Sequence, residues 1–271
     1  MSARPIPAWS LPAGAPPQVE APAGWRESLG REWAITGSRG GVDVCVVDSG
    51  IEADHPLVGR IESAVAVARG GDDELEIVPD EQGDVCGHGT ACAGIIRAIA
   101  PDARLHSVRV LGAGATGAGD LILAGLRHAI EAGHRVISLS LSTTKRRFAE
   151  ELHELADAAY FNRTVLVASA HNLPVESFPW RFSSVISVGS HEDADPLTWY
   201  ANPSPPVELF ARGVDVEVAW LGGGTLRCTG NSFAAPHIAG IAALVLAKHP
   251  ELTPYQLKTV LHLTASNAEG T

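Results

Sequence analysis

Residues 135–170 read "RVISLSLSTTKRRFAEELHELADAAYFNRTVLVASA". The stretch opens with a short run of alternating apolar residues, continues into a helical pattern over residues 148–161, and ends in a second apolar run over residues 164–170. A strand, a helix and a strand in this order form a right-handed crossover between parallel neighbours. The stretch therefore predicts one βαβ unit of a parallel sheet.

The same alternation continues on both sides of this unit. Helical patterns also cover residues 25–35 and 120–132, and another begins near His88. Further strands are predicted at residues 42–47, 105–111 and 184–189. Repeated strands and helices of this kind predict an α/β protein with three layers, in which a mostly parallel central sheet has helices on both faces.

The composition excludes two classes of partner. The 271 residues are 45% hydrophobic, which is enough to bury the core of a large domain. The formal charge of −11 argues against a nucleic-acid surface, because phosphate binding needs clustered Lys and Arg. The longest apolar run, residues 238–247, is far shorter than the roughly 20 residues of a membrane span. We expect neither nucleic acid nor a membrane as a partner.

The cysteines and the N-terminus indicate the compartment. Four cysteines are widely spaced without a Cys-x-x-Cys pair, which does not suggest a disulfide scaffold. The first 20 residues contain no continuous apolar segment of a secretory signal. We therefore expect a cytoplasmic protein. Cys86, His88 and Cys92 lack the further ligands that would complete a zinc site, so no metal is predicted there.

Two segments differ from the alternating pattern. Residues 1–22 are rich in Pro and Ala and are predicted to form an N-terminal arm, followed by one domain over residues 23–271. Residues 70–85 are predicted to form an exposed hairpin or loop. This second segment contains seven acidic residues: Asp72, Asp73, Glu74, Glu76, Asp80, Glu81 and Asp84.

Residues 112–117, "GAGATG", match the G-x-G-x-x-G pattern of a dinucleotide site and lie between a strand and a helix. Such a site also needs a carboxylate at the end of the next strand to hold the ribose, and residues 140–144 contain none. Asp120 at the start of the helix would repel the pyrophosphate. These features argue against an NAD-dependent oxidoreductase.

Three polar residues stand at the ends of predicted elements. Asp48 follows an apolar strand, His88 lies between two glycines, and Ser232 opens a long apolar helix after Gly230. Each residue alone has a structural explanation as a turn residue or a helix cap. Together they supply a nucleophile, a base and an orienting carboxylate. The neighbouring glycines are expected to leave room for a substrate backbone beside His88 and Ser232.

Three motifs resemble those of the subtilisin-like serine proteases: "VVDSGIEADHP" (46–56), "GHGTACAG" (87–94) and "GNSFAAPHIAG" (230–240). They follow the Asp, His, Ser order of subtilisin, and the similarity extends over about residues 33–263. The resemblance implies a subtilisin-like fold, with residues 23–271 as a serine endopeptidase domain. It further implies a catalytic triad of Asp48, His88 and Ser232, and an oxyanion-hole donor at Asn172.

The resemblance also implies how the substrate is held. Two segments are expected to pair with the substrate backbone: Ala115, Thr116 and Gly117, and Ser140, Leu141 and Ser142. Relatives usually carry glycine where Ser142, His171 and Trp180 stand, so these side chains are expected to change the specificity pocket. Glu176 and the acidic segment predict a preference for basic residues in the substrate.

Two further features concern Cys92 and calcium. Cys92, four residues after His88, resembles the free cysteine of the proteinase K branch and is expected to be a buried, noncatalytic thiol. The stretch "GIIRAIAPDA" (94–103) leaves no room for the calcium loop of many relatives. No cofactor is therefore predicted, and a weak calcium site in the acidic segment stays open.

Limited processing of an intracellular peptide or protein is the predicted role, because we expect neither a secretion signal nor a folding pro-domain before the motifs. Two alternatives stay open. An acyl-transferase or macrocyclase would use the same residues, although relatives of that kind insert a large cap where only 40 positions separate Asp48 and His88. The other is a noncatalytic peptide-binding protein. We also predict that the N-terminal arm lies in the cleft as an inhibitor, and that a partner protein completes the fold beyond Thr271.

Overall fold

The computed structural model describes residues 7–11, 14, 29–38, 40–71, 74–112 and 119–268. The helices are α1 (Arg31–Ile35), α2 (His88–Ile99), α3 (Gly119–Glu131), the 3₁₀ helix η1 (Arg146–Phe148), α4 (Ala149–Phe161), α5 (Asn231–Lys248) and α6 (Pro254–Leu263). The strands are β1 (Asp43–Asp48), β2 (Ser63–Arg69), β3 (Leu75–Pro79), β4 (Arg104–Arg109), β5 (Val136–Leu139), β6 (Val165–Ser169), β7 (Ile186–His191), β8 (Trp199–Ala201), β9 (Leu209–Arg212), β10 (Val216–Trp220) and β11 (Gly224–Cys228). None of the helices in these ranges combines the length and the apolar composition that a membrane span requires.

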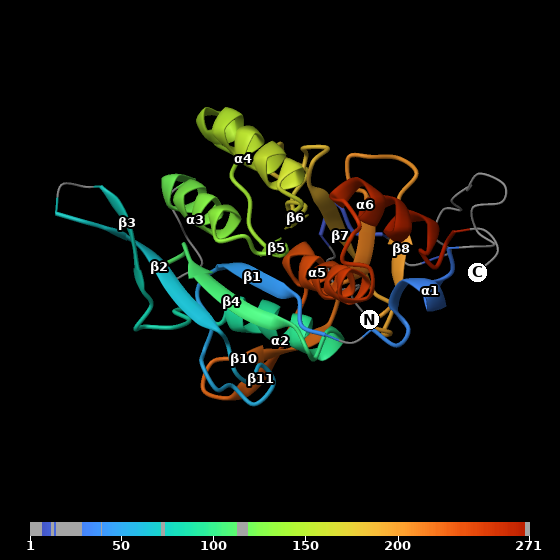
Figure 1. Ribbon diagram of the computed structural model, residues 1–271, viewed down its shortest axis with the longest axis horizontal. Coiled ribbons are helices and arrows are strands. Elements are labelled where there is room, and N and C mark those ends of the chain that lie inside the picture. Colours follow the sequence, from blue (N-terminus) through green and yellow to red (C-terminus); the bar gives the residue numbers. More distant parts are fainter. Residues whose placement is uncertain are drawn as a thin grey trace, which may run out of the picture.

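A nine-stranded sheet forms the centre of the molecule, in the order β3-β2-β4-β1-β5-β6-β7-β9-β8 (Figure 1). The pairs β2–β3 and β8–β9 are antiparallel and the other neighbours are parallel. The predicted βαβ unit is present as β5, α4 and β6, with Ile137 opposite Leu166. The α/β fold with a mostly parallel sheet and helices on both faces is confirmed.

The central strand β1 is buried on both faces, which explains its continuous apolar sequence. Val44 and Val46 belong to the hydrophobic cluster that contains α2 and α5. Cys45 and Val47 belong to the cluster on the opposite face, which contains α3 and α4. Because successive side chains of a strand point to opposite faces, one short segment joins both halves of the core. Asp48 is the last residue of this strand.

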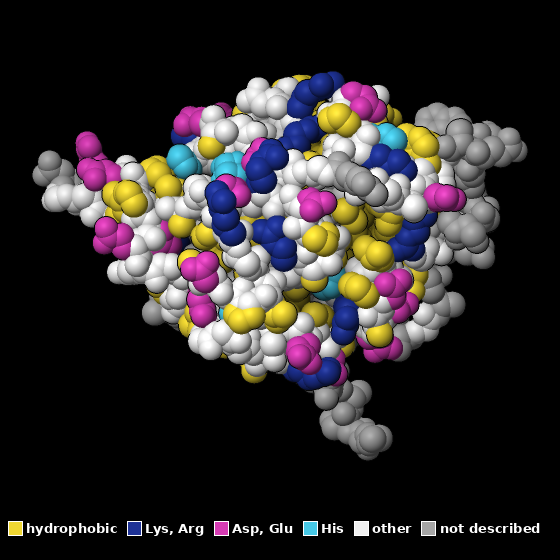
Figure 2. Space-filling model, turned by 60° about the horizontal axis from the view of Figure 1, so that its bottom comes forward, with side chains coloured by type: hydrophobic (Ala, Val, Ile, Leu, Met, Phe, Trp, Pro, Cys, Tyr) yellow, Lys and Arg dark blue, Asp and Glu magenta, His cyan; other side chains and the backbone are white. Residues whose placement is uncertain are grey.

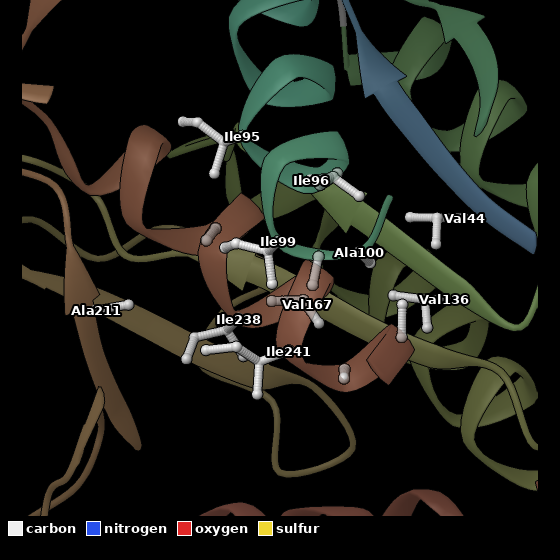
Figure 3. Close-up of a cluster of buried hydrophobic side chains, with 14 of the residues drawn as sticks. Val44, Ile95, Ile96, Ile99, Ala100, Val136, Val167, Ala211, Ile238 and Ile241 are labelled. Carbon is white, nitrogen blue, oxygen red and sulfur yellow. The ribbon is translucent and has the colours of Figure 1, made fainter. Parts of the chain in front are cut away.

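The helix α5 runs through the middle of one of these two clusters. Nearly all of its side chains are buried, as expected for a helix that is apolar all round. Figure 3 shows Ile238 and Ile241 of α5 in the same cluster as Ile99 of α2 and Val167 of β6. A Cβ atom at Gly240 would lie 2.9 Å from that of Ile99, so this glycine allows α2 and α5 to approach closely. The core thereby fixes the position of both helices that begin at the carboxyl edge of the sheet.

Two hairpins lie beyond the predicted βαβ units. The first joins β2 to β3 and projects from one end of the sheet (Figure 1). It contains part of the acidic segment, and Figure 2 shows Asp and Glu side chains gathered at this end of the molecule. The second hairpin, β10–β11, is a separate sheet that packs on α2, where a Cβ atom at Gly94 would lie 2.9 Å from that of Ala219.

Candidate active site

Asp48 ends β1 at the carboxyl edge of the sheet, where parallel α/β folds bind their ligands. Its side chain is buried, and Oδ1 accepts hydrogen bonds from His88 Nδ1 and from the N–H of Ser49, each at 2.8 Å. The first bond holds the proton of the neutral imidazole on Nδ1. His88 Nε2 is therefore left as a hydrogen-bond acceptor.

His88 is the first residue of α2, and two glycines determine where it lies. Gly87 has a φ of +92°, and a Cβ atom there would lie 2.7 Å from the ring of Trp220. A Cβ atom at Gly89 would lie 2.0 Å from the main-chain oxygen of Gly50. Both glycines are thus required by packing within the chain. The expectation that they make room for the substrate is wrong for this pair.

Asp84 fixes the start of α2, a role that was not predicted from the sequence. Its carboxylate lies at the N-terminus of the helix, where free N–H groups and the helix dipole favour a negative charge. The carboxylate accepts five hydrogen bonds: from the hydroxyl groups of Ser49 and Thr90 and from the N–H groups of Cys86, Gly87 and Thr90. Ser49 Oγ in turn accepts from the N–H of Gly89, so this network surrounds His88.

The acidic segment is not exposed throughout, which corrects the prediction. The side chain of Asp80 is fully buried and forms an ion pair with Arg109 at 3.0 Å. Asp84 is occupied by the five bonds described above. Buried carboxylates are retained where a cation or several N–H donors compensate for the loss of water. Of the acids considered for a weak calcium site, two are therefore already engaged.

Ser232 is the second residue of α5 and lines the same cavity as His88. A Cβ atom at Gly230 would lie 3.2 Å from Ser232 Oγ and 3.5 Å from Asn172 Nδ2. The glycine therefore keeps open a space that touches both the hydroxyl and the carboxamide. At this position the expectation that glycine makes room for a ligand is supported by the geometry.

Asn172 follows β6 and turns its carboxamide toward this space. Its Oδ1 accepts a hydrogen bond of 2.9 Å from the N–H of Asn231, which leaves Nδ2 as the donor on the cleft side. The N–H of Ser232 lies in the first turn of α5, where main-chain donors have no partner within the helix. The structure thus brings Asn172 beside Ser232, at the place where a developing oxyanion can be bound.

The cleft between these groups has a volume of about 310 Å³. Its wall is formed by His88, Leu111, Ser140, Leu141, Ser142, Ser169, Ala170, His171, Asn172 and Ser232. One predicted substrate-pairing segment, Ser140 to Ser142, therefore lies on the wall as expected. The other, Ala115, Thr116 and Gly117, lies outside the described residues. Leu111, Ser169 and Ala170 were not predicted as site residues, although all three lie in the last two positions of predicted strands.

Two residues predicted to shape the specificity pocket lie elsewhere. Trp180 is only 1% exposed and donates its Nε1 hydrogen to Ser177 Oγ at 2.8 Å, so the indole belongs to the core and not to the wall of the cleft. Glu176 forms ion pairs with Arg146 at 2.5 Å and Arg181 at 3.3 Å. The predicted preference for basic substrates depended on Glu176 and the acidic segment, and the carboxylate of Glu176 is already paired with these two cations.

The electrostatics of the site favour a charged imidazole. Burial lowers the pKa of His88, but the carboxylate of Asp48, with a smaller contribution from Cys92 and the hydrogen bonds to both, outweighs burial and holds this pKa well above its ordinary value. Cys92 is fully buried with Sγ 4.0 Å from His88 Nδ1, and burial raises the pKa of its thiol. Cys92 is therefore a neutral group beneath the imidazole, in agreement with the expected buried thiol.

Among the described residues, one group of side chains has the spacing to hold a metal ion. It comprises Asp48, His88 and Cys92, whose ligand atoms all lie within 4.8 Å of one another. The group differs by one residue from Cys86, His88 and Cys92, which were considered for a zinc site from the sequence, because it contains Asp48 and not Cys86. Asp48 and His88 are already joined by a hydrogen bond, so the carboxylate of Asp48 orients the imidazole of His88.

Comparisons with known proteins agree with this geometry. The model of the subtilase family matches residues 39–271. Subtilisin of Bacillus pumilus is 32% identical over 277 aligned residues, which cover 96% of this chain and 93% of that protein. The intracellular serine protease of Paenibacillus polymyxa is 31% identical over 243 residues, covering 84% of this chain and 70% of that protein.

A solved structure supports the same assignment at the level of the fold. The crystal structure of a cold-adapted subtilisin-like serine proteinase superposes with a TM-score of 0.68 and 26% sequence identity. The superposition covers 86% of this chain and 85% of that one. Family model, sequence relatives and fold agree over most of the chain. The chain therefore belongs to the subtilase family and is a subtilisin-like serine endopeptidase.

Proposed function

We propose that Ser232, His88 and Asp48 act as the catalytic triad, with Asn172 Nδ2 and the N–H of Ser232 as the oxyanion hole. The observation that carries the proposal is the 2.8 Å hydrogen bond between Asp48 Oδ1 and His88 Nδ1. It leaves His88 Nε2 as an acceptor in the cleft that Ser232 also lines. A hydroxyl beside a properly oriented imidazole is the arrangement that activates serine as a nucleophile.

In the first half of the reaction, Ser232 Oγ attacks the carbonyl carbon of the substrate while His88 Nε2 takes the hydroxyl proton. The carbonyl oxygen becomes an oxyanion in the space beside Gly230, within reach of Asn172 Nδ2. Asp48 stabilises the imidazolium that forms. His88 then returns the proton to the nitrogen of the leaving amine, the peptide bond breaks, and an acyl-enzyme remains.

In the second half, water takes the place of the amine. His88 Nε2 accepts a proton from the water, whose oxygen attacks the acyl carbon, and the proton then passes to Ser232 Oγ as the ester breaks. The chain and two substrates, peptide and water, supply every proton and electron pair in this scheme. The proposal therefore requires no cofactor.

We place the reaction in the limited processing of a peptide or protein inside the cell. The similarity to the intracellular serine protease of Paenibacillus polymyxa supports this assignment. The cleft adds a second argument, because Ser142 and His171, where relatives usually carry glycine, line its wall and would restrict which side chains can enter. A protease with a restricted pocket cleaves few sites in a given protein.

The proposal is tested by labelling the protein with a fluorophosphonate and by mass spectrometry of a peptide mixture incubated with it. Wild type is expected to label and to cleave, and Ser232→Ala to do neither. In subtilisin, loss of the corresponding serine costs about 10⁶-fold in kcat, a magnitude carried over from that enzyme. A folded wild type that does not label would point to a peptide-binding protein instead. Products joined to an added amine, in place of hydrolysed ends, would point to an acyl-transferase.

A further inference from the structure

Residues 7–11 lie against the back of the oxyanion site, beside β7 (Figure 1). The N–H of Ala8 donates to the main-chain oxygen of Asn172 at 2.7 Å, and the N–H of Leu11 donates to that of Ser190 at 2.7 Å. The segment forms a turn closed by a 2.9 Å hydrogen bond from the N–H of Ser10 to the oxygen of Pro7. It is thus attached to the same residue whose carboxamide faces Ser232.

The surface that receives this segment has a specific shape. A Cβ atom at Gly189 would lie 2.2 Å from the main-chain oxygen of Trp9, so only a glycine at position 189 allows the segment to lie there. The indole of Trp9 contacts that of Trp180, with ring centroids 5.9 Å apart. Trp9 and Leu11 pack against the cluster that contains α3 and α4. Backbone hydrogen bonds, a close approach at glycine and apolar packing together indicate a built docking groove.

Asn231 connects this segment to the oxyanion site a second time. Its side chain is fully buried; Oδ1 accepts from the N–H of Ser190 at 3.0 Å and from Ser190 Oγ at 2.9 Å. Its Nδ2 donates to the main-chain oxygens of Ala170 at 3.2 Å and His171 at 3.4 Å. Ser10 Oγ is hydrogen-bonded to Ser190 Oγ and lies 3.5 Å from Asn231 Oδ1. The residues just before Asn172 are therefore held by a network that ends on Ser10.

We propose that residues 7–11 position the oxyanion hole, with Ala8 and Ser10 as positioning residues. The proposal rests on the proposed function, in which Asn172 Nδ2 binds the oxyanion. Ala8 fixes the main chain of Asn172, and Ser10 fixes the carboxamide network that holds residues 170 and 171. An oxyanion donor acts only when it is held in place before the charge develops, so the segment supports kcat more than substrate binding.

This role differs from the inhibitory one expected from the sequence. The wall of the cleft contains none of residues 7–11. The hydrogen bond from the segment to Asn172 is made to the main-chain oxygen and not to the carboxamide. The remaining residues of the predicted arm, apart from Gly14, lie outside the described part of the chain. Removal of the contacts made by residues 7–11 is thus expected to lower activity.

The decisive variant is Ala8→Pro in the full-length chain. Ala8 is the second residue of the turn closed by Pro7 and Ser10, where proline is favoured, so the turn is kept while the N–H donor to Asn172 is lost. We expect kcat to fall about tenfold with KM unchanged within about twofold. Ala8→Gly keeps the N–H and is the matched control, with kcat within about twofold of wild type. The affinity of a peptide aldehyde, which forms a tetrahedral adduct, is expected to fall in parallel with kcat.

A double-mutant cycle shows whether the effect passes through Asn172. In an Asn172→Ala background, Ala8→Pro is expected to change kcat by less than about twofold, because the group that it positions is absent. Ser10→Ala is the second variant if Ala8→Pro does not fold; we expect about a threefold loss of kcat that Ser10→Thr restores. An equal loss of kcat in both backgrounds would overturn the proposal.

The remaining outcomes separate this proposal from the proposed function. If wild type hydrolyses peptides and Ala8→Pro matches Ala8→Gly, the positioning role fails while the triad stands. A rise in kcat or in kcat/KM of Ala8→Pro would show that the segment inhibits and would overturn the positioning role. If wild type neither labels with a fluorophosphonate nor hydrolyses peptides, the proposed function fails and this inference fails with it.

Discussion

The thiol of Cys92 lies 3.7 Å from the main-chain oxygen of Ser232. In a regular helix that oxygen would accept a hydrogen bond from the N–H four residues later. In α5 the residue at that position is Pro236, which has no N–H to donate. The Cys92 S–H thus serves as a donor to a carbonyl that proline leaves free, at the first turn of the helix that presents Ser232.

Cys92→Ala is expected to reduce the free energy of unfolding by about 1–3 kcal/mol, because it leaves a buried carbonyl without a donor and removes a buried sulfur atom. Urea denaturation measures this change. Cys45→Ala is the control, since Cys45 is also fully buried but lies in β1, away from Ser232. Because Cys92 is not a nucleophile in the proposed reaction, the variant should retain fluorophosphonate labelling. A variant that keeps its stability but loses labelling would contradict this structural role.

The pH dependence of kcat/KM should reveal the pKa of His88, since the base must be unprotonated before it can accept the serine proton. Asp48 holds this pKa well above its ordinary value, so the protonated, inactive form persists to higher pH. Activity is therefore expected to fall as the pH falls through a midpoint above the ordinary imidazole value of about 6.5. Rates measured with one peptide from pH 5 to 10 give the midpoint.

Two variants identify the cause of that shift. Asp48→Asn removes the charge that raises the pKa of His88 and is expected to move the midpoint down, with a large loss of kcat from the altered tautomer. Cys92 contributes less than Asp48 to the raised pKa of His88, and burial raises the pKa of its own thiol, so Cys92→Ala is expected to move the midpoint down by less than Asp48→Asn does. A midpoint that moves with Cys92 and not with Asp48 would assign the shift to a thiolate.

Substrate selection is expected to depend on Ser142 and His171, which line the wall of the cleft. Ser142→Gly removes a hydroxymethyl group from this wall. We expect it to raise kcat/KM for a peptide with Phe before the scissile bond, relative to the same peptide with Ala, by roughly tenfold. His171→Gly should act in the same direction. The measurement is a competition between the two peptides, followed by mass spectrometry.

Trp180→Phe is the control for this experiment, because the indole is buried away from the cleft. For this variant, the ratio of kcat/KM for the peptide with Phe to kcat/KM for the peptide with Ala should match that of wild type. A ratio that changes with Trp180 and not with Ser142 would restore the pocket role that the family resemblance suggested for Trp180.

The fold could be predicted because its strands are buried on both faces and its crossovers are long helices. Such strands have continuous apolar sequences, as in residues 42–47, and α4 occupies the predicted residues almost completely. The strands β2, β8, β9, β10 and β11 were not predicted. Of these, β8, β9 and β11 are only three to five residues long, and β11 is largely exposed, so neither a long apolar run nor a strong alternation marks these three.

The triad candidates could be predicted because each is the polar residue that ends or opens an apolar element. Partners of buried charges could not, since a pairing such as Asp80 with Arg109 joins positions far apart in the sequence. The role of residues 7–11 was hidden for the same reason, because Ala8 meets Asn172 only after the sheet has formed. The role of Asp84 could have been predicted from the local sequence, because this acidic residue precedes a predicted helix by four residues.

Asp84→Asn tests whether the start of α2 positions His88. The carboxamide of the variant has one acceptor oxygen and one NH₂ group in place of two acceptor oxygens. Because the NH₂ group cannot accept from the N–H and hydroxyl donors around it, about half of the five hydrogen bonds are lost. We expect a loss of about 2–4 kcal/mol in the free energy of unfolding and a loss of kcat under conditions where the variant is folded. Urea denaturation and peptide hydrolysis on the same preparation measure both, with Glu76→Gln on the exposed hairpin as the control of equal charge change. If kcat of folded Asp84→Asn equals that of wild type, His88 is held by Asp48 and the glycines alone.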